Sequence, residues 1–346
     1  MKNNLLLVLC ILYVQQSIAQ YTLIPDPNFE QALIDLNIDS EGVLDGQVLT
    51  IDINTISYLD VNDKNIDDLT GIEDFTNLKI LFCWGNNLSF LNTSNNFLLE
   101  ELYCDNNNFN TPLDLLNNSN LRLLTCTVSN LSSLDVSNNL LLEALFCGNE
   151  FDLIPVNTIT ELDVSNNINL KNINVFDLFT LESLDLSNNP NLEIVRAEMA
   201  WTPSALTELN LANGNNEILT EVSTLFNQDL LCIEVDNATA ATNGDYPYSE
   251  WFINEEASFS EDCNLGVEKF LKQKVHIYPN PVKNEFYVES KELILKSIQI
   301  YDLIGRLVLV EKERFNLINI SSIESGILFV RINTDQGILI KKIVKN

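Results

Sequence analysis

The sequence predicts a strand-rich solenoid of short parallel coils, followed by a small second domain that is also rich in strands. Two observations support this expectation. Leucine residues recur with a period of about 21 residues over roughly residues 50–220. The charge also changes near residue 266, because residues 20–266 contain 5 basic and 40 acidic side chains, whereas residues 267–346 contain 13 basic and 9 acidic ones. The chain of 346 residues, with a formal net charge of −30, therefore divides into two unlike parts.

The acidic composition of residues 20–266 excludes several classes of function. A net charge of −35 over this part repels phosphate backbones, so we expect no nucleic-acid binding. The only histidine of the chain, His276, lies in the basic part. Ser-His-Asp catalysis and zinc sites with histidine ligands are therefore not available to the acidic part.

The N-terminal residues predict a secretory signal peptide over residues 1–19. Lys2 precedes an unbroken apolar run from Leu5 to Val14, and Ser17 and Ala19 supply the small residues of a cleavage site after Ala19. A membrane anchor is the alternative, but this run is too short to cross a bilayer, which takes ~20 residues. Cys10 lies inside the run, where it does not suit lipidation. We expect an exported, soluble chain without a transmembrane segment.

The repeat consists of two nested half-coils. The first reads Leu78-x-x-Leu81-x-Cys83-x-x-Asn86, and it recurs at Leu99, Leu121 and Leu142. The second is typified by Leu131-x-x-Leu134-x-Val136-x-x-Asn139. This pattern resembles the leucine-rich-repeat family over roughly residues 50–220. With so few residues in each coil, long helices have no room, and we expect a leucine-rich-repeat solenoid of parallel β-strands with short coils and little helix.

The spacing has a direct physical reason. Residues at positions 1, 4 and 6 of each half-coil face a narrow core, and neighbouring coils pair as parallel strands ~4.8 Å apart. The resemblance implies that the asparagine at position 9 bonds the backbone of adjacent coils. In the second half-coils these residues are Asn96, Asn118, Asn139, Asn167 and Asn189. The first half-coils are less regular, because Ser129 and Glu150 stand at the asparagine position.

The cysteines fall into two groups. Those at position 6 of the first half-coils are Cys83, Cys104, Cys126 and Cys147. Because stacked side chains point the same way, they suit disulfide geometry poorly, and we expect free buried thiols rather than disulfides or a metal site. Cys232 and Cys263 lie beyond the repeats, where the sequence looks like the closing segment of bacterial leucine-rich-repeat proteins. In an exported chain this isolated pair predicts a disulfide.

The expected organisation has six parts. A signal peptide (1–19) precedes an N-terminal cap (20–55), the repeats (56–218), a C-terminal cap (219–266), a linker (267–274) and a final domain (275–346). In the N-terminal cap, residues 24–36 predict a short amphipathic helix. Its apolar residues Phe29, Ala32, Leu33 and Leu36 would cover the first coil.

The last part resembles the type A C-terminal sorting domain of cargo for the type IX secretion system. The residues that carry this resemblance are Tyr278, Pro279, Asn280 and Pro281, then Gly305 within the sequence IYDLIGR, then Gly326, and the basic end with Lys341 and Lys342. Leu328 stands where the family often has tyrosine. The resemblance implies a small β-sandwich, the outer-membrane translocon as a partner, and a location outside a Gram-negative bacterium or on its outer-membrane surface. The alternative is an adhesive β-sandwich without a sorting role.

Position 5 of each half-coil points outward, and in the first half-coils it is largely aromatic. We expect a ligand-binding surface formed by Phe82, Tyr103, Thr125 and Phe146, with Trp84 and Asp105 two residues further on. Exposed aromatic rows mark recognition surfaces. The alternative is that these rings only stabilise neighbouring strands by packing on one another.

In the second half-coils the outward position is largely acidic. It is occupied by Asp114, Asp135, Asp163 and Asp185, with Asn92 and Asn210 in the same place, so we expect this acidic stripe on a second sheet. A solvated face, calcium binding and glycoside hydrolysis by paired carboxylates are its three alternatives. The sequence contains no Asp-x-Asp-x-Asp-Gly loop, which argues against calcium binding. The spacing of stacked coils would place any two aspartates at the separation that glycosidases use, so this separation is not evidence for hydrolysis. The solvated face is therefore favoured.

These observations predict an exported, monomeric leucine-rich-repeat protein that binds a protein or glycan ligand through its strand surface. We expect no catalytic residues, no resident metal and no cofactor, with calcium as the alternative. Two other functions stay open. One is a passive structural or adhesive role at the cell surface, and the other is a glycoside-degrading enzyme.

Overall fold

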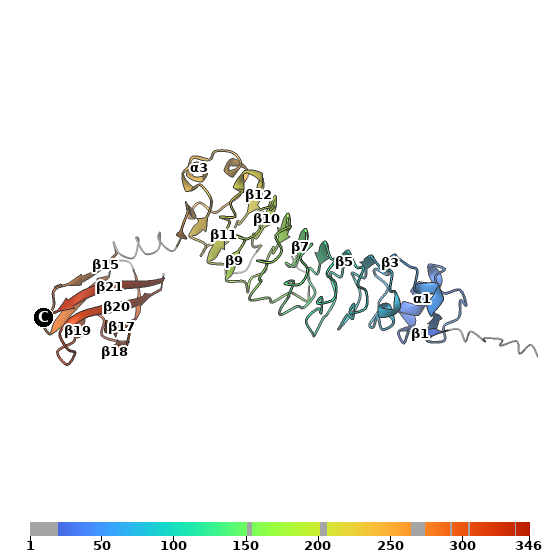
Figure 1. Ribbon diagram of the computed structural model, residues 1–346, viewed down its shortest axis with the longest axis horizontal. Helices are drawn as coiled ribbons and strands as arrows, with labels where there is room; N and C mark the ends of the chain where they lie inside the picture. Colours follow the sequence, from blue (N-terminus) through green and yellow to red (C-terminus); the bar gives the residue numbers. More distant parts are fainter. Residues whose placement is uncertain are drawn as a thin grey trace, which may run out of the picture.

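The computed structural model describes residues 20–150, 154–200, 206–263, 274–290, 293–303, 305–335 and 337–346. The predicted signal peptide and residues 267–273 of the predicted linker lie outside these ranges. Coils stack along one axis between helix α1 (Pro27–Asp35) and helix α3 (Ala238–Asn243), as Figure 1 shows. The stack is the predicted strand-rich solenoid, and the C-terminal region forms antiparallel sheets.

The N-terminal cap is a short sheet and a helix that are bonded to the first coil. Strands β1 (Tyr21–Leu23) and β2 (Gln47–Leu49) pair antiparallel, and the second leads into helix α2 (Thr50–Ile53). Asp26 begins α1, because one of its carboxylate oxygens accepts hydrogen bonds from the N–H groups of Asn28 and Phe29. Its other oxygen accepts the N–H groups of Asp67 and Asp68, at 2.7 and 3.0 Å. One carboxylate therefore joins the cap to the repeats.

The buried face of α1 follows the prediction with one exception. Phe29, Ala32 and Leu33 are buried, but Leu36 is 43% exposed. The helix ends at Asp35, and Leu36 is its C-cap residue, which turns away from the buried stripe. The prediction that Leu36 covers the first coil is therefore wrong.

The main sheet consists of eight parallel strands of three residues each. In order along the stack they are β3 (Tyr58–Asp60), β4 (Ile80–Phe82), β5 (Glu101–Tyr103), β6 (Leu123–Thr125), β7 (Ala144–Phe146), β8 (Asn172–Asn174), β10 (Ile194–Arg196) and β12 (Glu221–Ser223). The middle residue of every strand, such as Leu81 or Leu102, is fully buried. The residues on either side of it point outward, because side chains alternate along a strand.

The second sheet is shorter than predicted. It contains β9 (Ser183–Asp185), β11 (Glu208–Asn210), β13 (Cys232–Glu234) and β14 (Ser258–Ser260), all parallel. Among the described residues, the second half-coils before residue 183 are not strands. Parallel pairing continues beyond residue 218, where the sequence repeats fade. Single helical turns complete the coils at η1 (Ile72–Asp74), η2 (Asn216–Ile218) and η3 (Tyr248–Glu250).

A ladder of buried asparagines supports the coils where the second sheet is missing. Asn139 is fully buried, and its side-chain amide donates to the carbonyl oxygens of Leu115 and Asn118 at 3.2 and 2.9 Å. Asn96, Asn118, Asn167 and Asn189 are equally buried and bond the preceding coil in the same way. The amide therefore satisfies carbonyl groups that water cannot reach.

The first half-coils have their own ladder, which includes a residue that the repeat pattern missed. Asn157, rather than Glu150, occupies the asparagine position of the fourth cysteine coil. Its amide donates to Cys126 O and Cys147 O at 2.8 and 3.0 Å, and its oxygen accepts the N–H of Leu131 at 2.8 Å. This coil carries extra residues before Asn157, so fixed spacing could not find it.

The four periodic cysteines are free thiols in the core, as predicted. The Cys104 thiol donates to Thr125 O of the next coil at 3.2 Å. Burial raises the pKa of Cys147 to about 12 and raises the pKa values of Cys83, Cys104 and Cys126 as well. These thiols therefore behave as small apolar side chains.

The far end of the solenoid is closed by a disulfide and an aromatic cluster. Cys232 of β13 is bonded to Cys263, with the two Cα atoms 5.8 Å apart. Trp251 donates its indole N–H to Leu219 O at 2.8 Å, and its ring packs against Tyr248 and Phe259. These contacts cover the last coil.

The C-terminal region has a separate hydrophobic core between two antiparallel sheets. The first sheet contains β15 (Val275–Tyr278), β16 (Glu285–Ser290) and β19 (Leu317–Asn319). The second contains β18 (Leu307–Glu311), β17 (Leu295–Tyr301), β20 (Gly326–Thr334) and β21 (Gly337–Lys345). Phe286, Ile300 and Ile332 are among the fully buried residues of this core.

Burial of the thiols predicts two linked observations. In the chain that begins at residue 20, Cys83, Cys104, Cys126 and Cys147 should resist a thiol reagent until the solenoid is unfolded. The unfolding free energy should also fall as the pH rises above about 9, because the exposed thiols of the unfolded chain ionise there and the buried ones do not. Peptide mass spectrometry after labelling, and urea unfolding at pH 7 and pH 10, check both. Rapid labelling of the native protein would show that the thiols are accessible.

Candidate ligand-binding surface

An aromatic patch lies on the outward face of strands β3, β4 and β5, and we define it as Tyr58, Phe82, Trp84 and Tyr103. The rings of Phe82 and Tyr103 stack with centroids 4.1 Å apart and an interplanar angle of 7°. Tyr58 leans on Phe82, with centroids 5.6 Å apart. Phe82 and Tyr103 meet because they are register partners in neighbouring parallel strands.

Tyr58 was missing from the predicted set, although the sequence contained the signal for it. The prediction used only the residue that follows the buried centre of each strand. The first residue of a strand faces outward as well, and Tyr58 is the first residue of β3. It is 55% exposed, and Trp84 is 38% exposed. The patch therefore presents aromatic surface to solvent.

Two of the predicted polar residues lie next to the patch but bond each other. The Thr125 hydroxyl donates to the Asp105 carboxylate, whose other oxygen accepts the N–H of Thr127 at 2.8 Å. Asp105 therefore holds two neighbouring coils in register. Its side chain is a fixed negative charge beside the rings.

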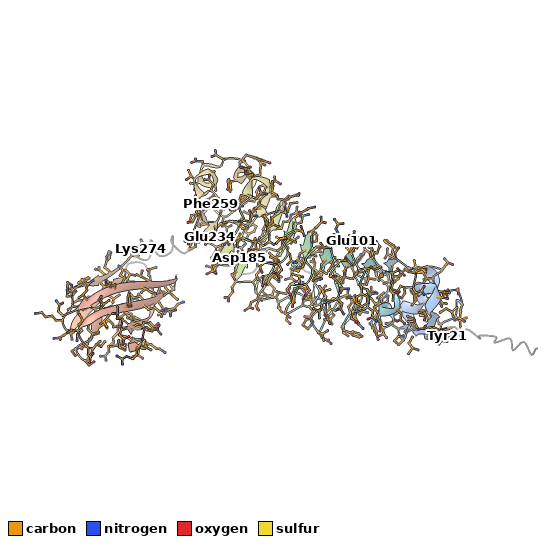
Figure 2. The ribbon with its side chains drawn as sticks, viewed as in Figure 1. Tyr21, Glu101, Asp185, Glu234, Phe259 and Lys274 are labelled. Carbon is orange, nitrogen blue, oxygen red and sulfur yellow. A yellow bond between two sulfur atoms is a disulfide. The ribbon has the colours of Figure 1, made fainter. Side chains whose placement is uncertain are left out.

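The Tyr103 side chain is held by its stacking on Phe82 and by a hydrogen bond of its hydroxyl group. Its hydroxyl donates to the carboxylate of Glu101 at 2.8 Å, on the same strand β5, where Figure 2 labels Glu101. Partial burial and the hydrogen bond to Glu101 raise the pKa of Tyr103 to about 12. The phenol therefore stays protonated and oriented across the physiological range.

Phe146 shares the outward column but not the stack. In the strand register, Tyr103 is paired with Thr125, and Thr125 is paired with Phe146. One whole strand therefore separates Phe146 from Tyr103. Phe146 extends the surface along the sheet and stands outside the patch.

A column of alternating charges runs beside the strands of the main sheet. The residues that precede successive strands are Lys79, Glu100, Arg122, Glu143 and Lys171, and each after Lys79 has its backbone N–H bonded to the carbonyl of the one before. Ion pairs join Lys79 to Glu100, Arg122 to Glu143 and Lys171 to Glu143. A further pair joins Arg196 to Glu221.

These ion pairs decide where positive charge is available. Residues 20–266 contain five basic residues, and four of them are paired with glutamates of the same solenoid. Each pair is exposed and stabilises the fold only weakly. The acidic side chains of residues 20–266 outnumber the basic ones 40 to 5, so few of these carboxylates can be ion-paired within the solenoid.

The residues of the acidic stripe perform a local structural task. One carboxylate oxygen of each accepts the backbone N–H two residues further on, from Leu116, Ser137, Ser165 and Ser187 respectively. Such turns are a normal use of aspartate. The prediction that the stripe lies on a second sheet is wrong for Asp114, Asp135 and Asp163, and of the four only Asp185 belongs to a strand. The half-coils end in turns there rather than in paired strands.

Two open hollows interrupt the surface. One, of about 230 Å³, is lined by Glu161, Asp163 and Asp185 together with serines. The other, of about 470 Å³, follows strands β4 and β5 and is lined by glycine, asparagines, Ile154 and Pro155. Among the described residues that line it, this larger hollow offers hydrogen-bonding amides and no ionisable group.

Two parts of the predicted sorting motif are in contact. The Asn280 side chain bonds the backbone of Lys342 and Val344 on β21, so the first and last parts of the motif are in contact. Gly305 and Gly326 have positive φ values of 81° and 151°, which side chains rarely allow. Arg306, next to Gly305, bonds Asp302 through its guanidinium at 2.9 Å.

Among the residues that the structure describes, no group of three or more histidine, cysteine or acidic side chains is arranged to hold a metal ion. Within the same residues, no helix has the length and apolar character that a membrane span requires.

The turns of the acidic stripe predict a pH dependence. Hydrogen bonds from Ser137 lower the pKa of Asp135, and those from Ser165 lower the pKa of Asp163. Free carboxyls titrate at about 3.9, so this stabilisation is fully present above about pH 4 and is lost as the pH falls through the lowered values. The double variant Asp135→Asn, Asp163→Asn keeps the acceptor oxygens.

Urea unfolding at pH 7 and pH 3 measures this dependence. The double variant should lose less unfolding free energy between the two pH values than the parent protein. The matched variant Asp135→Ala, Asp163→Ala lacks the acceptors, so it should already be destabilised at pH 7. Identical losses in the parent and the asparagine variant would show that the turns do not depend on ionised carboxylates.

Part of the chain matches a known protein family. Residues 276–346 match the family model of the secretion system C-terminal sorting domain. No curated protein matches the sequence. Similar solved structures come from Listeria monocytogenes. The functional domain of InlJ, which includes a cysteine ladder, is 18% identical, with coverage of 95% of this chain and 99% of that chain and a TM-score of 0.42.

Two internalins are also similar. Internalin C2 is 18% identical, with coverage of 71% of this chain and 100% of that chain and a TM-score of 0.46. Internalin InlF is 20% identical, with coverage of 73% and 75% and a TM-score of 0.46. With such TM-scores these similarities add nothing about ligands or activity. The chain thus combines a strand-rich solenoid of leucine-rich repeats with a C-terminal region, residues 276–346, that matches the sorting domain of a secretion system.

Proposed function

We propose that the protein is an exported binding module that holds a ligand on the aromatic patch, without catalysis of its own. One observation carries this proposal. Tyr58, Phe82 and Tyr103 form a row of contacting rings on the outward face of the sheet, and Tyr58 and Trp84, two residues after Phe82, are exposed. Aromatic side chains dominate binding energy at protein interfaces, because they bury a large area at a small cost in conformational entropy.

The patch is held in place before any ligand arrives. The strand centres beneath it are fully buried, and the bonds from Tyr103 to Glu101 and from Thr125 to Asp105 fix its border. A preformed surface loses little freedom on binding, so more of the contact energy becomes affinity. The geometry therefore favours recognition over a passive surface.

The charge around the patch indicates the chemistry of the ligand. Asp60 is paired with Phe82 in the strand register, and the Glu101 carboxylate accepts a hydrogen bond from Tyr103. Asp105 follows Tyr103 by two residues and accepts the N–H of Thr127. Carboxylates attract cations, and the faces of aromatic rings attract them as well. We infer a ligand that presents basic side chains, such as a protein surface rich in arginine or lysine. A neutral glycan would use the rings alone.

Ring stacking could instead serve only the fold, because cross-strand aromatic pairs stabilise sheets. Substitution separates the two roles. The variant Phe82→Ser, Trp84→Ser, Tyr103→Ser should bind an arginine-rich peptide about tenfold more weakly or worse, as expected when two cation–π contacts are lost. Its matched control replaces three exposed leucines outside the patch, Leu116→Ser, Leu140→Ser and Leu141→Ser, and should bind normally.

Calorimetry with an arginine-rich peptide, a glutamate-rich peptide of equal length and a neutral oligosaccharide measures the preference. A second pair of variants tests local charge. Asp60→Asn, Glu101→Gln, Asp105→Asn should weaken peptide binding, whereas Asp114→Asn, Asp135→Asn, Asp185→Asn removes the same charge elsewhere and should not. Equal weakening in both would indicate nonspecific attraction. Unchanged binding by the aromatic variant would favour a passive structural component.

A further inference from the structure

The coil of strand β7 carries an insert whose two ends are fixed to the core. Asn149 and Asn157 are buried at these ends and bond each other. The N–H of Asn157 donates to Asn149 Oδ1 at 2.6 Å, and the Asn149 amide donates to Asn157 O at 3.1 Å. The Asn157 amide also bonds Cys126 O and Cys147 O, which lie in two neighbouring coils. A loop with such a fixed base holds its outer residues in a defined place.

The insert reaches back along the stack to earlier coils. Its residues Ile154 and Pro155 line the hollow of about 470 Å³. The same hollow is lined by Asn87, which follows β4, and by Asn106 and Asn108, which follow β5. The coil of β6 lies between, because β6 pairs with β5 on one side and with β7 on the other. In repeat proteins, insertions of this kind gather on the binding face, and ligand pockets occupy ~300–1,000 Å³.

The exposed asparagines of the hollow have hydrogen-bonding groups to spare. Among the residues that the structure describes, the side-chain amides of Asn87 and Asn106 have no hydrogen-bond partner, and both side chains are exposed. The oxygen of Asn108 accepts one bond, from the Asn130 amide at 3.1 Å. Each amide places an NH₂ donor and an oxygen acceptor side by side in one plane. The hollow therefore offers several donors and acceptors to a ligand.

The charges near the hollow exclude one class of ligand. Asp105 directly precedes its residues, and its carboxylate is bonded to the hydroxyl of Thr125 and the N–H of Thr127. The Asp63 carboxylate lies against Gly85, at the place where a side chain of that residue would be. Both carboxylates repel anions. Since the described residues that line the hollow carry no ionisable group, its own chemistry suits an uncharged ligand.

We propose that this hollow binds a neutral oligosaccharide, at a site separate from the aromatic patch. Neighbouring hydroxyl groups of a sugar each donate and accept, which matches the paired groups of Asn87, Asn106 and Asn108. Ile154 and Pro155 provide apolar surface for the carbon face of a sugar ring. An extended peptide is the competing ligand. It presents peptide groups to one side only every ~7 Å, whereas neighbouring coils repeat at ~4.8 Å, so it would use fewer of the amides.

Binding measurements on the chain that begins at residue 20 test this proposal. The probes are lactose, maltotriose, cellotriose and chitotriose on an array, with sialyllactose as the anionic sugar and an uncharged Gly-Ser peptide as the competitor. We expect at least one neutral sugar to bind and the last two probes not to bind. The variant Asn87→Ala, Asn106→Gly, Asn108→Ala should weaken sugar binding by about tenfold or more, as expected when several hydrogen bonds are lost. Asn106 is replaced by glycine because its φ of 51° disfavours other side chains.

The matched control replaces three exposed asparagines of other turns, Asn95→Ala, Asn138→Ala and Asn188→Ala, and should bind the sugar normally. Ile154→Ser should weaken sugar binding without removing any amide. Phe82→Ser, Trp84→Ser, Tyr103→Ser should keep sugar binding while it loses the arginine-rich peptide, so failure of one site is distinguishable from failure of the other. Urea unfolding checks that each variant is folded. Binding of no neutral sugar, preference for the Gly-Ser peptide, or equal sugar binding by the two asparagine variants would overturn the proposal.

Discussion

This narrow solenoid can form only if its buried backbone carbonyl groups find hydrogen-bond donors. Coils of about 21 residues are too short for long helices or a wide second sheet, so many carbonyls face inward without a strand partner. Asparagine amides supply the missing donors, as Asn139 does for Leu115 and Asn118. An unsatisfied buried polar group costs about 1–3 kcal/mol. The ladder therefore supplies donors to interior carbonyl groups, although the amide oxygens of Asn96, Asn139, Asn167 and Asn189 are themselves buried without a partner among the described residues.

This division of labour leaves the outward positions free to differ. On the main sheet they carry the aromatic patch, while the residues before the strands carry the column of ion pairs. The aspartates of the acidic stripe complete turns. Stability therefore resides mainly in buried residues, and the outward residues can differ from coil to coil without disturbing the core.

Periodicity predicted the parts of the fold that depend on repeated inward positions, including the asparagine ladder and the free thiols. Periodicity did not predict residues whose positions depend on the length of one coil or on the end of one helix. Asn157 was missed because its coil is longer, and Leu36 was misplaced because the helix ends one residue earlier. The hydrogen bonds from Lys341 to Val275 O and from Lys345 to Ile323 O could not be predicted either, because they depend on how the two sheets of the C-terminal region pack.

The most direct test of the asparagine ladder compares two neighbouring residues in the middle of the stack. Asn139 is fully buried, whereas Asn138 is exposed. Urea unfolding should show that Asn139→Ala lowers the unfolding free energy by about 1–3 kcal/mol, while Asn138→Ala changes it by less than about 0.5 kcal/mol. Equal stability of the two variants would contradict the account, because the stack would then not depend on its buried amides.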